Sequence, residues 1–521
     1  MLTKAGRWPI APLALPVLVA FPLWSANFTR ISYGMVLPAV LTVIALTIAL
    51  FGLLWFATRQ AARASLITTV WLAVVLYAPS LISSASTNHW ILVTGSVLAL
   101  LLAFGVSRRI SRENDSQIRR ANGLINLMMG VPAFMIVGSL CFMQYTIEQG
   151  RPEPDTIFPR FPGRATTKSP DVWHFVMDRY AGTETLANRF GYDNRPFLDA
   201  LRKRGFAVAE HAYSNYQVTP LSLASTLNAS YLDRYTSQLG SDVDIVPMFR
   251  AIDHNAAFDF FKRQGYQITF AGGWADVTAH SALADRTITF RPLGEFPRTL
   301  MEQSIPGVFG KALGLPYADG RKDQCLRVKY KFKHLREIVK EPQRKYVFAH
   351  FLIPHPPYAL TNDGSCQSIA EARRIGRSKS YVAQVEYANS QLLHLIDAIL
   401  AAPRPATIII QADEGPYPPK YAIDEPAFDV KLPTDSDYLN DTADIRREKT
   451  GIILAIRHGD GKSDSMPRSP VNIYPAITNH SFGTHIPFKE DKTLMFGWTP
   501  NYKELRDVSA ETFGMTPDKG R

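Results

Sequence analysis

Residues 172–178 read Val-Trp-His-Phe-Val-Met-Asp, a short and mostly apolar run that ends in a carboxylate. Such a run predicts a strand that is buried on both faces. Asp178 then stands at the carboxyl end of this strand. A helical pattern follows over residues 184–204, so the run opens an alternation of strands and helices.

The alternation continues towards the C-terminus. Further strands are predicted at 206–209, 266–271, 346–352, 406–412 and 451–456, with helices near 255–264 and 379–401. This order is typical of an α/β fold, a mostly parallel sheet covered by helices on both faces. Ligands of such sheets bind outside the carboxyl ends of the strands. Asp178, His355 and the pair Asp413-Glu414 all follow strand ends, which predicts a site at that edge.

The N-terminal part has a different composition. We expect five membrane-spanning helices at 9–28, 35–57, 65–84, 90–106 and 123–145, since about 20 apolar residues cross a bilayer. The first segment carries four prolines, so four helices are the alternative. Lys and Arg alternate between the loops in a way that places everything after Tyr145 outside the cytoplasm. The apolar cores hold no charged residue, which disfavours a transporter.

These patterns divide the chain into four parts. They are a transmembrane domain at 1–146, a Pro-rich linker at 147–169, a catalytic domain at 170–500 and a tail at 501–521. The net charge is +11, but the basic residues follow the membrane topology, so nucleic-acid binding is disfavoured. Three cysteines are too few for a disulfide scaffold. Cys325 and Cys366 both fall in the exported domain, and their pairing stays open.

The carboxylates are the first candidates for chemistry. Asp178, Asp413 and Glu414 converge on one edge, and three anions together are unfavourable without a cation. Oxygen ligands favour Mn²⁺ or Mg²⁺, with Zn²⁺ as the alternative. The competing interpretation is that each carboxylate caps a helix or pairs with an Arg.

Two further segments carry candidate catalytic residues. Thr219-Pro220 is a helix start, where a hydroxyl is well placed for phosphate chemistry, and Ser222, one turn later, is a candidate substrate-binding residue. His355 lies among prolines and could bind a phosphate or protonate a leaving group, unless it is an ordinary loop histidine. His350 is interpreted as a core residue.

Three other residues are secondary candidates. Trp274 follows a strand and either lines the substrate pocket or packs in the core. His480 and His485 either supply extra metal ligands or lie in a surface loop.

The ordered set resembles a known family. Asp178 after a strand, Thr219-x-x-Ser222, His-Pro-Pro-Tyr at 355–358 and Asp413-x-Gly415 resemble the alkaline phosphatase superfamily over residues 170–480. They are most similar to its membrane-anchored sulfatase-like branch, which includes lipoteichoic acid synthases and phosphoethanolamine and phosphoglycerol transferases. That branch typically joins five N-terminal helices to an extracytoplasmic, alkaline-phosphatase-like α/β domain.

The resemblance implies a mechanism. Asp178 and Asp413 would bind a metal, Thr219 would be the metal-bound nucleophile that forms a phospho-enzyme, and His355 would contact the substrate phosphate. The enzyme would move a phospho-group from a phospholipid donor to an envelope glycan or lipid, at the inner membrane with its catalytic domain in the periplasm.

Two departures from the family pattern are informative. The usual Asp-His-Gly is Asp413-Glu414-Gly415 here, so a carboxylate replaces the expected imidazole ligand, or the site is altered or inactive. The maturation motif of true sulfatases is replaced by Thr219-Pro-Leu-Ser-Leu223, which disfavours sulfate ester hydrolysis by that route. A phosphodiester or ester hydrolase and a non-catalytic scaffold for an envelope polymer are the alternatives.

Overall fold

The chain forms two compact units in a computed structural model, which describes residues 6–86, 88–154, 157–166, 169–273, 276–290, 294–421, 437–462, 466–497 and 500–513. One unit comprises Met1–Gln149 and Leu293–Gly320, and the other comprises Gly150–Pro292 and Arg321–Arg521. The second unit contains every described residue that the sequence predicts to be catalytic or metal-binding.

The first unit is helical and crosses the membrane. Its described part holds four helices that are long and apolar enough to span a bilayer, namely α3 (Tyr33–Thr58), α4 (Ala61–Ala85), α5 (His89–Arg112) and α6 (Asp115–Gln149). The first expected span forms a shorter helix, α2 (Ile10–Ser25), of 16 residues with Pro16 and Pro22 inside it. At about 1.5 Å per residue it falls short of a bilayer core of about 30 Å.

Large apolar side chains on these helices are exposed, as lipid-facing residues should be. Phe134 on α6 is 80% exposed and Leu53 on α3 is 71% exposed. The segment that joins this unit from later in the chain contains α13 (Glu295–Glu302) and α14 (Ile305–Ala312). Phe296 of α13 is buried with Phe21 and Trp24 of α2. Two short helices from the middle of the sequence therefore belong to the membrane unit.

The second unit is built on a seven-stranded sheet. Its order is β2-β9-β7-β1-β6-β4-β5, and the strands β7, β1, β6, β4 and β5 run parallel. The strand β9 is antiparallel to both of its neighbours. The bounds are β1 (Asp171–Met177), β2 (Ala207–Val208), β4 (Gln267–Ala271), β5 (Arg286–Thr287), β6 (Lys345–Phe351), β7 (Ala406–Gln411) and β9 (Leu454–Arg457). This confirms the α/β class.

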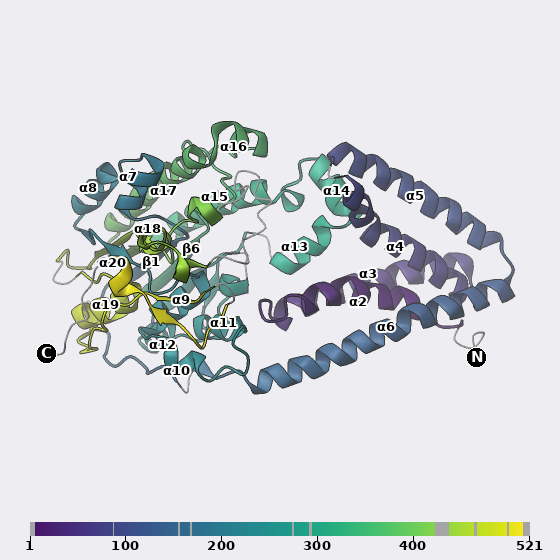
Figure 1. The fold of residues 1–521 in the computed structure, drawn as a ribbon, viewed down its shortest axis with the longest axis horizontal. Coiled ribbons are helices and arrows are strands. Elements are labelled where there is room, and N and C mark those ends of the chain that lie inside the picture. The colour runs from purple at the N-terminus through teal and green to yellow at the C-terminus, as the bar shows by residue number, and fades with distance from the viewer. Residues whose placement is uncertain are drawn as a thin grey trace. The chain divides into compact units, whose positions relative to one another are not determined.

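Helices cover both faces of this sheet (Figure 1). One group contains α7 (Thr183–Phe190), α8 (Arg195–Arg202), α15 (Gly320–Val339) and α17 (Arg377–Leu400). The other contains α9 (Thr219–Asn228), α11 (Val246–Asp253), α12 (Ala256–Arg263) and α19 (Ile473–Phe482). The remaining α-helices and strands are β3 (Ala212–Tyr213), α10 (Asp233–Thr236), α16 (Ile369–Ile375), α18 (Ala443–Thr450), β8 (Gly451–Ile452), β10 (Leu494–Met495), β11 (Arg506–Asp507) and α20 (Ser509–Phe513).

The strand β1 lies at the centre of the sheet and is buried at every position. Its neighbours β6 and β7 are both in parallel register with it, and Val176 is aligned with His350 on one side and with Gln411 on the other. The carboxyl ends of these three strands therefore lie at one edge, side by side. The single strand expected at 451–456 divides into β8, which pairs with β3, and β9, which joins the main sheet.

Candidate metal and phosphate site

Three buried side chains meet at the carboxyl edge of the sheet. Asp178 follows β1, His350 lies near the end of β6, and Asp413 follows β7. One ligand atom from each residue lies within 4.8 Å of the other two. Because β1 is the middle strand of the three, this convergence follows directly from the strand order.

Each residue of this trio has one potential ligand atom that makes no hydrogen bond within the described part of the chain. Among the described residues, Asp178 Oδ1, His350 Nε2 and Asp413 Oδ2 are buried without a hydrogen bond. Thr278 Oγ1 lies 2.9 Å from His350 Nδ1, and Nε2 on the other side of the ring lies 3.4 Å from Asp178 Oδ2. A ring nitrogen fixed in this way leaves the other free for a metal.

The charges of the trio call for a cation. Burial raises the pKa of Asp413 well above its usual range, and the neighbouring Asp178 and Glu414 carboxylates raise it further. Burial also acts to raise the pKa of Asp178, but His355, His350 and Arg179 outweigh it, so the net shift is downwards. Two carboxylates and one imidazole are a donor set that suits Zn²⁺ or Mn²⁺, so these residues fit a divalent metal.

Thr219 is the first residue of α9, and Pro220 occupies the next position in the first turn. Its Oγ1 donates a hydrogen bond of 3.3 Å to Oε1 of Glu414. Thr219 also acts to lower the pKa of the neighbouring Asp413, although burial raises that pKa more strongly. The hydroxyl of Thr219, at the start of a helix, thus bonds the residue that follows Asp413 of the trio.

Glu414 lies between two buried cations. Arg179 Nη2 is 2.8 Å from its Oε1, and Lys449 Nζ forms an ion pair with its Oε2. The guanidinium of Arg179 stacks on the ring of Tyr417 at 3.5 Å. Burial, with Arg179 nearby, lowers the pKa of Lys449 to about 8 against the opposing effect of Glu414. The carboxylate of Glu414 is therefore neutralised by side chains of the protein.

The residues of this site lie within a part of the chain that matches a protein family model. The sulfatase family model matches residues 170–480, which is more than half of the chain. The chain belongs to the sulfatase family. The match covers Asp178, Thr219, His355 and Asp413, and it confirms the resemblance that the ordered motifs carry.

Solved structures show likeness to this sulfatase-family chain at low identity. The C-terminal periplasmic domain of EcEptC from Escherichia coli, in complex with Zn, is 12% identical, with a TM-score of 0.45 over 68% of this chain and 98% of that one. The phosphonate monoester hydrolase of Agrobacterium radiobacter is 13% identical, with a TM-score of 0.38 over 68% and 79%. The corresponding domain of phosphoethanolamine transferase EptC from Campylobacter jejuni is 12% identical, with a TM-score of 0.36 over 63% and 95%. No curated protein sequence gives a significant match.

Three other residues that the sequence predicts for this sulfatase-family site are His355, Ser222 and Trp274. His355 follows β6 and faces Tyr417, with ring centroids 6.4 Å apart, and burial lowers its pKa. Ser222 is fully buried and donates 2.6 Å to the carbonyl oxygen of Asp413, so it holds the loop that carries this carboxylate. Trp274 lies outside the described residues.

The two C-terminal histidines are not brought to the site. His480 Nε2 lies 3.0 Å from Asp460, and its ring stacks on His458 at 3.9 Å. The adjacent Gly459 approaches Pro170 and Ala406, at the amino ends of β1 and β7. His480 is therefore at the opposite edge of the sheet. His485 is exposed in the segment after α19.

The sequence reasoning missed three residues of the sulfatase-family site. His350 is a ligand candidate and not the core residue that the sequence pattern predicts, although a histidine near the end of an apolar strand is itself a signal of a site. Arg179 adjoins Asp178 in the sequence and adopts a left-handed backbone with φ of 62°. Lys449 precedes β8 and had no local signal, because only the fold brings it to Glu414.

Proposed function

We propose that the protein is a metal-dependent transferase that moves a phospho-group from a phospholipid to an envelope glycan or lipid through a phospho-threonine at Thr219. The family supports an enzyme that transfers or hydrolyses phosphate or related esters. The observation that carries the finer proposal is the Thr219 hydroxyl, 3.3 Å from Glu414 and beside the trio of Asp178, His350 and Asp413.

In this proposal, Thr219 Oγ attacks the phosphorus of the donor, and its proton passes to Oε1 of Glu414. The bond between phosphorus and the diacylglycerol oxygen breaks, and that oxygen takes up a proton from solvent. The hydroxyl of the acceptor then attacks phospho-Thr219 and releases its own proton to solvent. Thr219 leaves and recovers its proton from Glu414, so both residues return to their starting state.

Arg179 is suited to hold the phosphate. Its Nε and Nη1 are buried and have no hydrogen bond among the described residues, while Nη2 is engaged with Glu414. Donors of a guanidinium that lack hydrogen bonds can each bond an oxygen of the substrate, and the charge of the guanidinium attracts a phosphate group. Asp178, His350 and Asp413 would hold the metal, which when bound would polarise a phosphoryl oxygen and stabilise the negative charge that builds there.

The location fits a lipid donor. We place the catalytic unit in the periplasm, since Arg108, Arg109, Arg112, Arg119 and Arg120 surround the turn between α5 and α6 and mark it as cytoplasmic. The disulfide between Cys325 and Cys366 is typical of an oxidising compartment. A membrane anchor keeps the site near lipid head groups and raises their effective concentration.

Intact-protein mass spectrometry tests this proposal. The full chain is incubated in phospholipid micelles with phosphatidylglycerol or phosphatidylethanolamine and then quenched in acid. We expect an added phosphoglycerol or phosphoethanolamine group on Thr219 in the unaltered chain and in Thr219→Ser, and none in Thr219→Ala. Diacylglycerol release without any adduct, at an equal rate in Thr219→Ala, would contradict it, and turnover to free head group alone would indicate the hydrolase.

A further inference from the structure

A hollow of about 320 Å³ lies in the α/β unit, away from the residues of the metal and phosphate site. Besides Ile375 at the end of α16 (Ile369–Ile375), three segments line it. They are the end of α7 with Phe190 and Tyr192, the loop after β6 with Asn362 and Gln367, and one face of α17. The proposed phospho-transfer assigns no role to any of these residues.

Gln367 is an unpartnered polar group in the wall of this hollow. Its side chain is only 3% exposed, and neither its amide nitrogen nor its amide oxygen has a hydrogen bond among the described residues. Buried amides without partners are rare because each unmade bond costs free energy. A ligand that both donates and accepts would satisfy both atoms, and hydroxyl groups do both.

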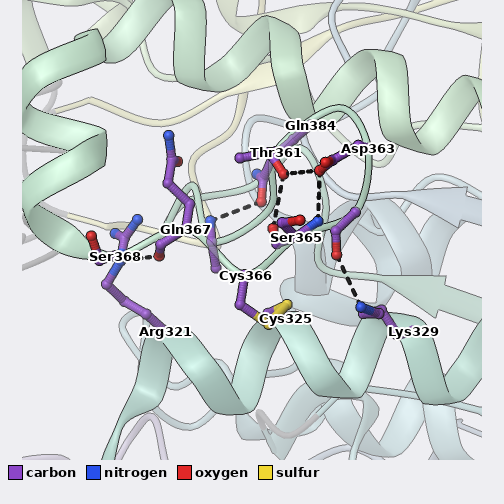
Figure 2. Close-up of a disulfide and its surroundings, with 12 residues drawn as sticks. Arg321, Cys325, Lys329, Thr361, Asp363, Ser365, Cys366, Gln367, Ser368 and Gln384 are labelled. Atoms are coloured by element: carbon purple, nitrogen blue, oxygen red, sulfur yellow. Dashed lines mark hydrogen bonds between the residues drawn. A yellow bond between two sulfur atoms is a disulfide. The ribbon is translucent and has the colours of Figure 1, made fainter.

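The loop that carries Gln367 is held rigidly. The disulfide between Cys325 and Cys366 ties it to α15 immediately before Gln367 (Figure 2). The backbone nitrogen of Gln367 also donates a hydrogen bond of 2.8 Å to the carbonyl oxygen of Ala359. A fixed backbone means that the amide is presented in one place, as a binding group should be.

Aromatic side chains form another part of the lining. Phe190 is fixed by stacking on Tyr381, with centroids 4.2 Å apart, and Tyr192 beside it is partly exposed. At the rim, Asn362 Nδ2 donates 3.1 Å to Glu386, so a second amide and a carboxylate are within reach. An aromatic wall favours an apolar ring face, while the polar groups favour hydroxyls. A pyranose ring has both features.

The helix α17 connects this hollow to the catalytic loops. Lys379, Val382, Ala383 and Glu386 have the spacing of one helix face, and all four line the hollow. Two side chains of α17 donate hydrogen bonds to these loops. Tyr381 donates one of 2.7 Å to the carbonyl oxygen of Arg179, and Gln384 donates one of 3.3 Å to the carbonyl oxygen of His355. The hollow is therefore about one helix width, roughly 10 Å, from the loops that hold the phosphate-binding residues.

From this arrangement we infer that the hollow between α7, the disulfide-bound loop and α17 binds a sugar residue of an envelope glycan. That this glycan is the acceptor of the phospho-group rests on the proposed function, whereas the binding itself does not. A chain seated at Gln367 and Tyr192 would extend past α17 and present a hydroxyl to the catalytic site.

Binding of cell-envelope oligosaccharides tests the inference. The probes are fragments released by mild acid from the envelope of the source cells and separated by length, titrated into the full chain in detergent micelles. We expect saturable binding that weakens about tenfold in Gln367→Leu and in Tyr192→Ala, the loss of about one good hydrogen bond or ring contact. Tyr192→Phe keeps the ring and should keep the affinity.

The matched control is Gln391→Leu, an amide on α17 that bonds Arg336 and does not line the hollow. It should leave binding unchanged. Gln367→Leu removes an amide without a partner, so its thermal midpoint should not fall, which separates lost binding from misfolding. The inference would be overturned if no fragment bound saturably, or if Gln367→Leu and Tyr192→Ala bound the fragments as tightly as the unaltered chain does.

A further variant separates this inference from the proposed function. Asp413→Asn should abolish adduct formation on Thr219 and keep the oligosaccharide affinity. If the unaltered chain transfers phospho-groups while Gln367→Leu leaves the KM for the glycan unchanged, the sugar site is wrong and the transferase stands. If the fragments bind through Gln367 but no adduct forms, the transferase is wrong and the sugar site stands.

Discussion

The hydroxyl of Thr219 donates a hydrogen bond of 3.3 Å to Glu414, the residue that stands where the superfamily's Asp-His-Gly motif has a histidine. Arg179 and Lys449 neutralise this carboxylate on its other sides. The departure from the family motif therefore has a structural counterpart. In the proposed function, Glu414 is the base that takes the proton of Thr219, and it is not a metal ligand.

The first prediction concerns this role of Glu414. Glu414→Gln keeps the shape of the side chain and removes its ability to take a proton from Thr219, so adduct formation should slow by about 10²- to 10⁴-fold. Metal affinity should change little, since Asp178, His350 and Asp413 remain. Rapid-quench mass spectrometry gives the rate and calorimetry gives the affinity. Loss of metal in Glu414→Gln would instead make Glu414 a ligand, as its place in the motif implies.

The second prediction concerns the buried ion pair of Lys449 and Glu414, whose side chains are 2% and 1% exposed. Lys449→Met leaves a buried carboxylate with one cation fewer, and the free energy of unfolding should fall by about 3 kcal/mol. Chemical denaturation measures this quantity. The control is Lys262→Met, whose partner Asp285 lies 3.3 Å away on the surface, and its cost should stay below about 1 kcal/mol. An equal loss of unfolding free energy in Lys449→Met and Lys262→Met would contradict a stabilising buried ion pair between Lys449 and Glu414.

The third prediction concerns the disulfide. Cys325 and Cys366 are 41 positions apart, and closing a loop of that length stabilises the folded state by about 4 kcal/mol in the chain-entropy description. The double variant Cys325→Ser, Cys366→Ser should therefore unfold at a lower denaturant concentration. Reduction of the unaltered chain should reproduce that shift and should have no effect on the double variant. A midpoint that neither change moves would show that the bond does not form.

The fourth prediction concerns acid stability. Burial lowers the pKa of His174 to about 3 from an ordinary 6.5, and its Nδ1 lies 2.8 Å from the hydroxyl of Tyr474. Because the pKa of His174 is lower in the folded chain than in the unfolded chain, the unfolded chain takes up the proton first as the pH falls. The free energy of unfolding therefore has its full value above pH 6.5 and decreases as the pH falls towards 3. The loss is about 1.4 kcal/mol per pH unit. His174→Gln should flatten the pH dependence of the unfolding free energy between these limits, and an unchanged slope would contradict the burial of a neutral ring.

The fold was predictable because its signals are local. The apolar runs at β1, β6 and β7 are short, and those at β1 and β7 are closely followed by Asp178 and Asp413, so the type of these strands and the edge that they share followed from pattern alone. The number of spans did not follow from composition, because α2 has the composition of a span but forms a helix of only 16 residues. The membership of α13 and α14 in the membrane unit had no local signal, since it depends on contacts with helices far away in the sequence.

The site residues that follow strand ends were predictable from the sequence. Those whose role depends on tertiary packing were not. Asp178 and Asp413 converge as the strand order requires, and Thr219 begins a helix as Thr-Pro predicts. Whether a histidine in a strand is core or ligand depends on which neighbour its free nitrogen faces, and His350 faces Asp178. Lys449 reaches Glu414 only through the path of α18 into β8.

The most direct test is the metal content of the full chain. The unaltered protein, stripped and then incubated with Zn²⁺, Mn²⁺ or Mg²⁺, should retain one equivalent of one ion, and its thermal midpoint should rise with that ion. His350→Leu and Asp413→Asn should each lose the ion and the shift, while His480→Leu, at the far edge of the sheet, should keep both. An unaltered chain that is folded, free of metal and unmoved by any of the three ions would contradict the metal site and the transferase with it.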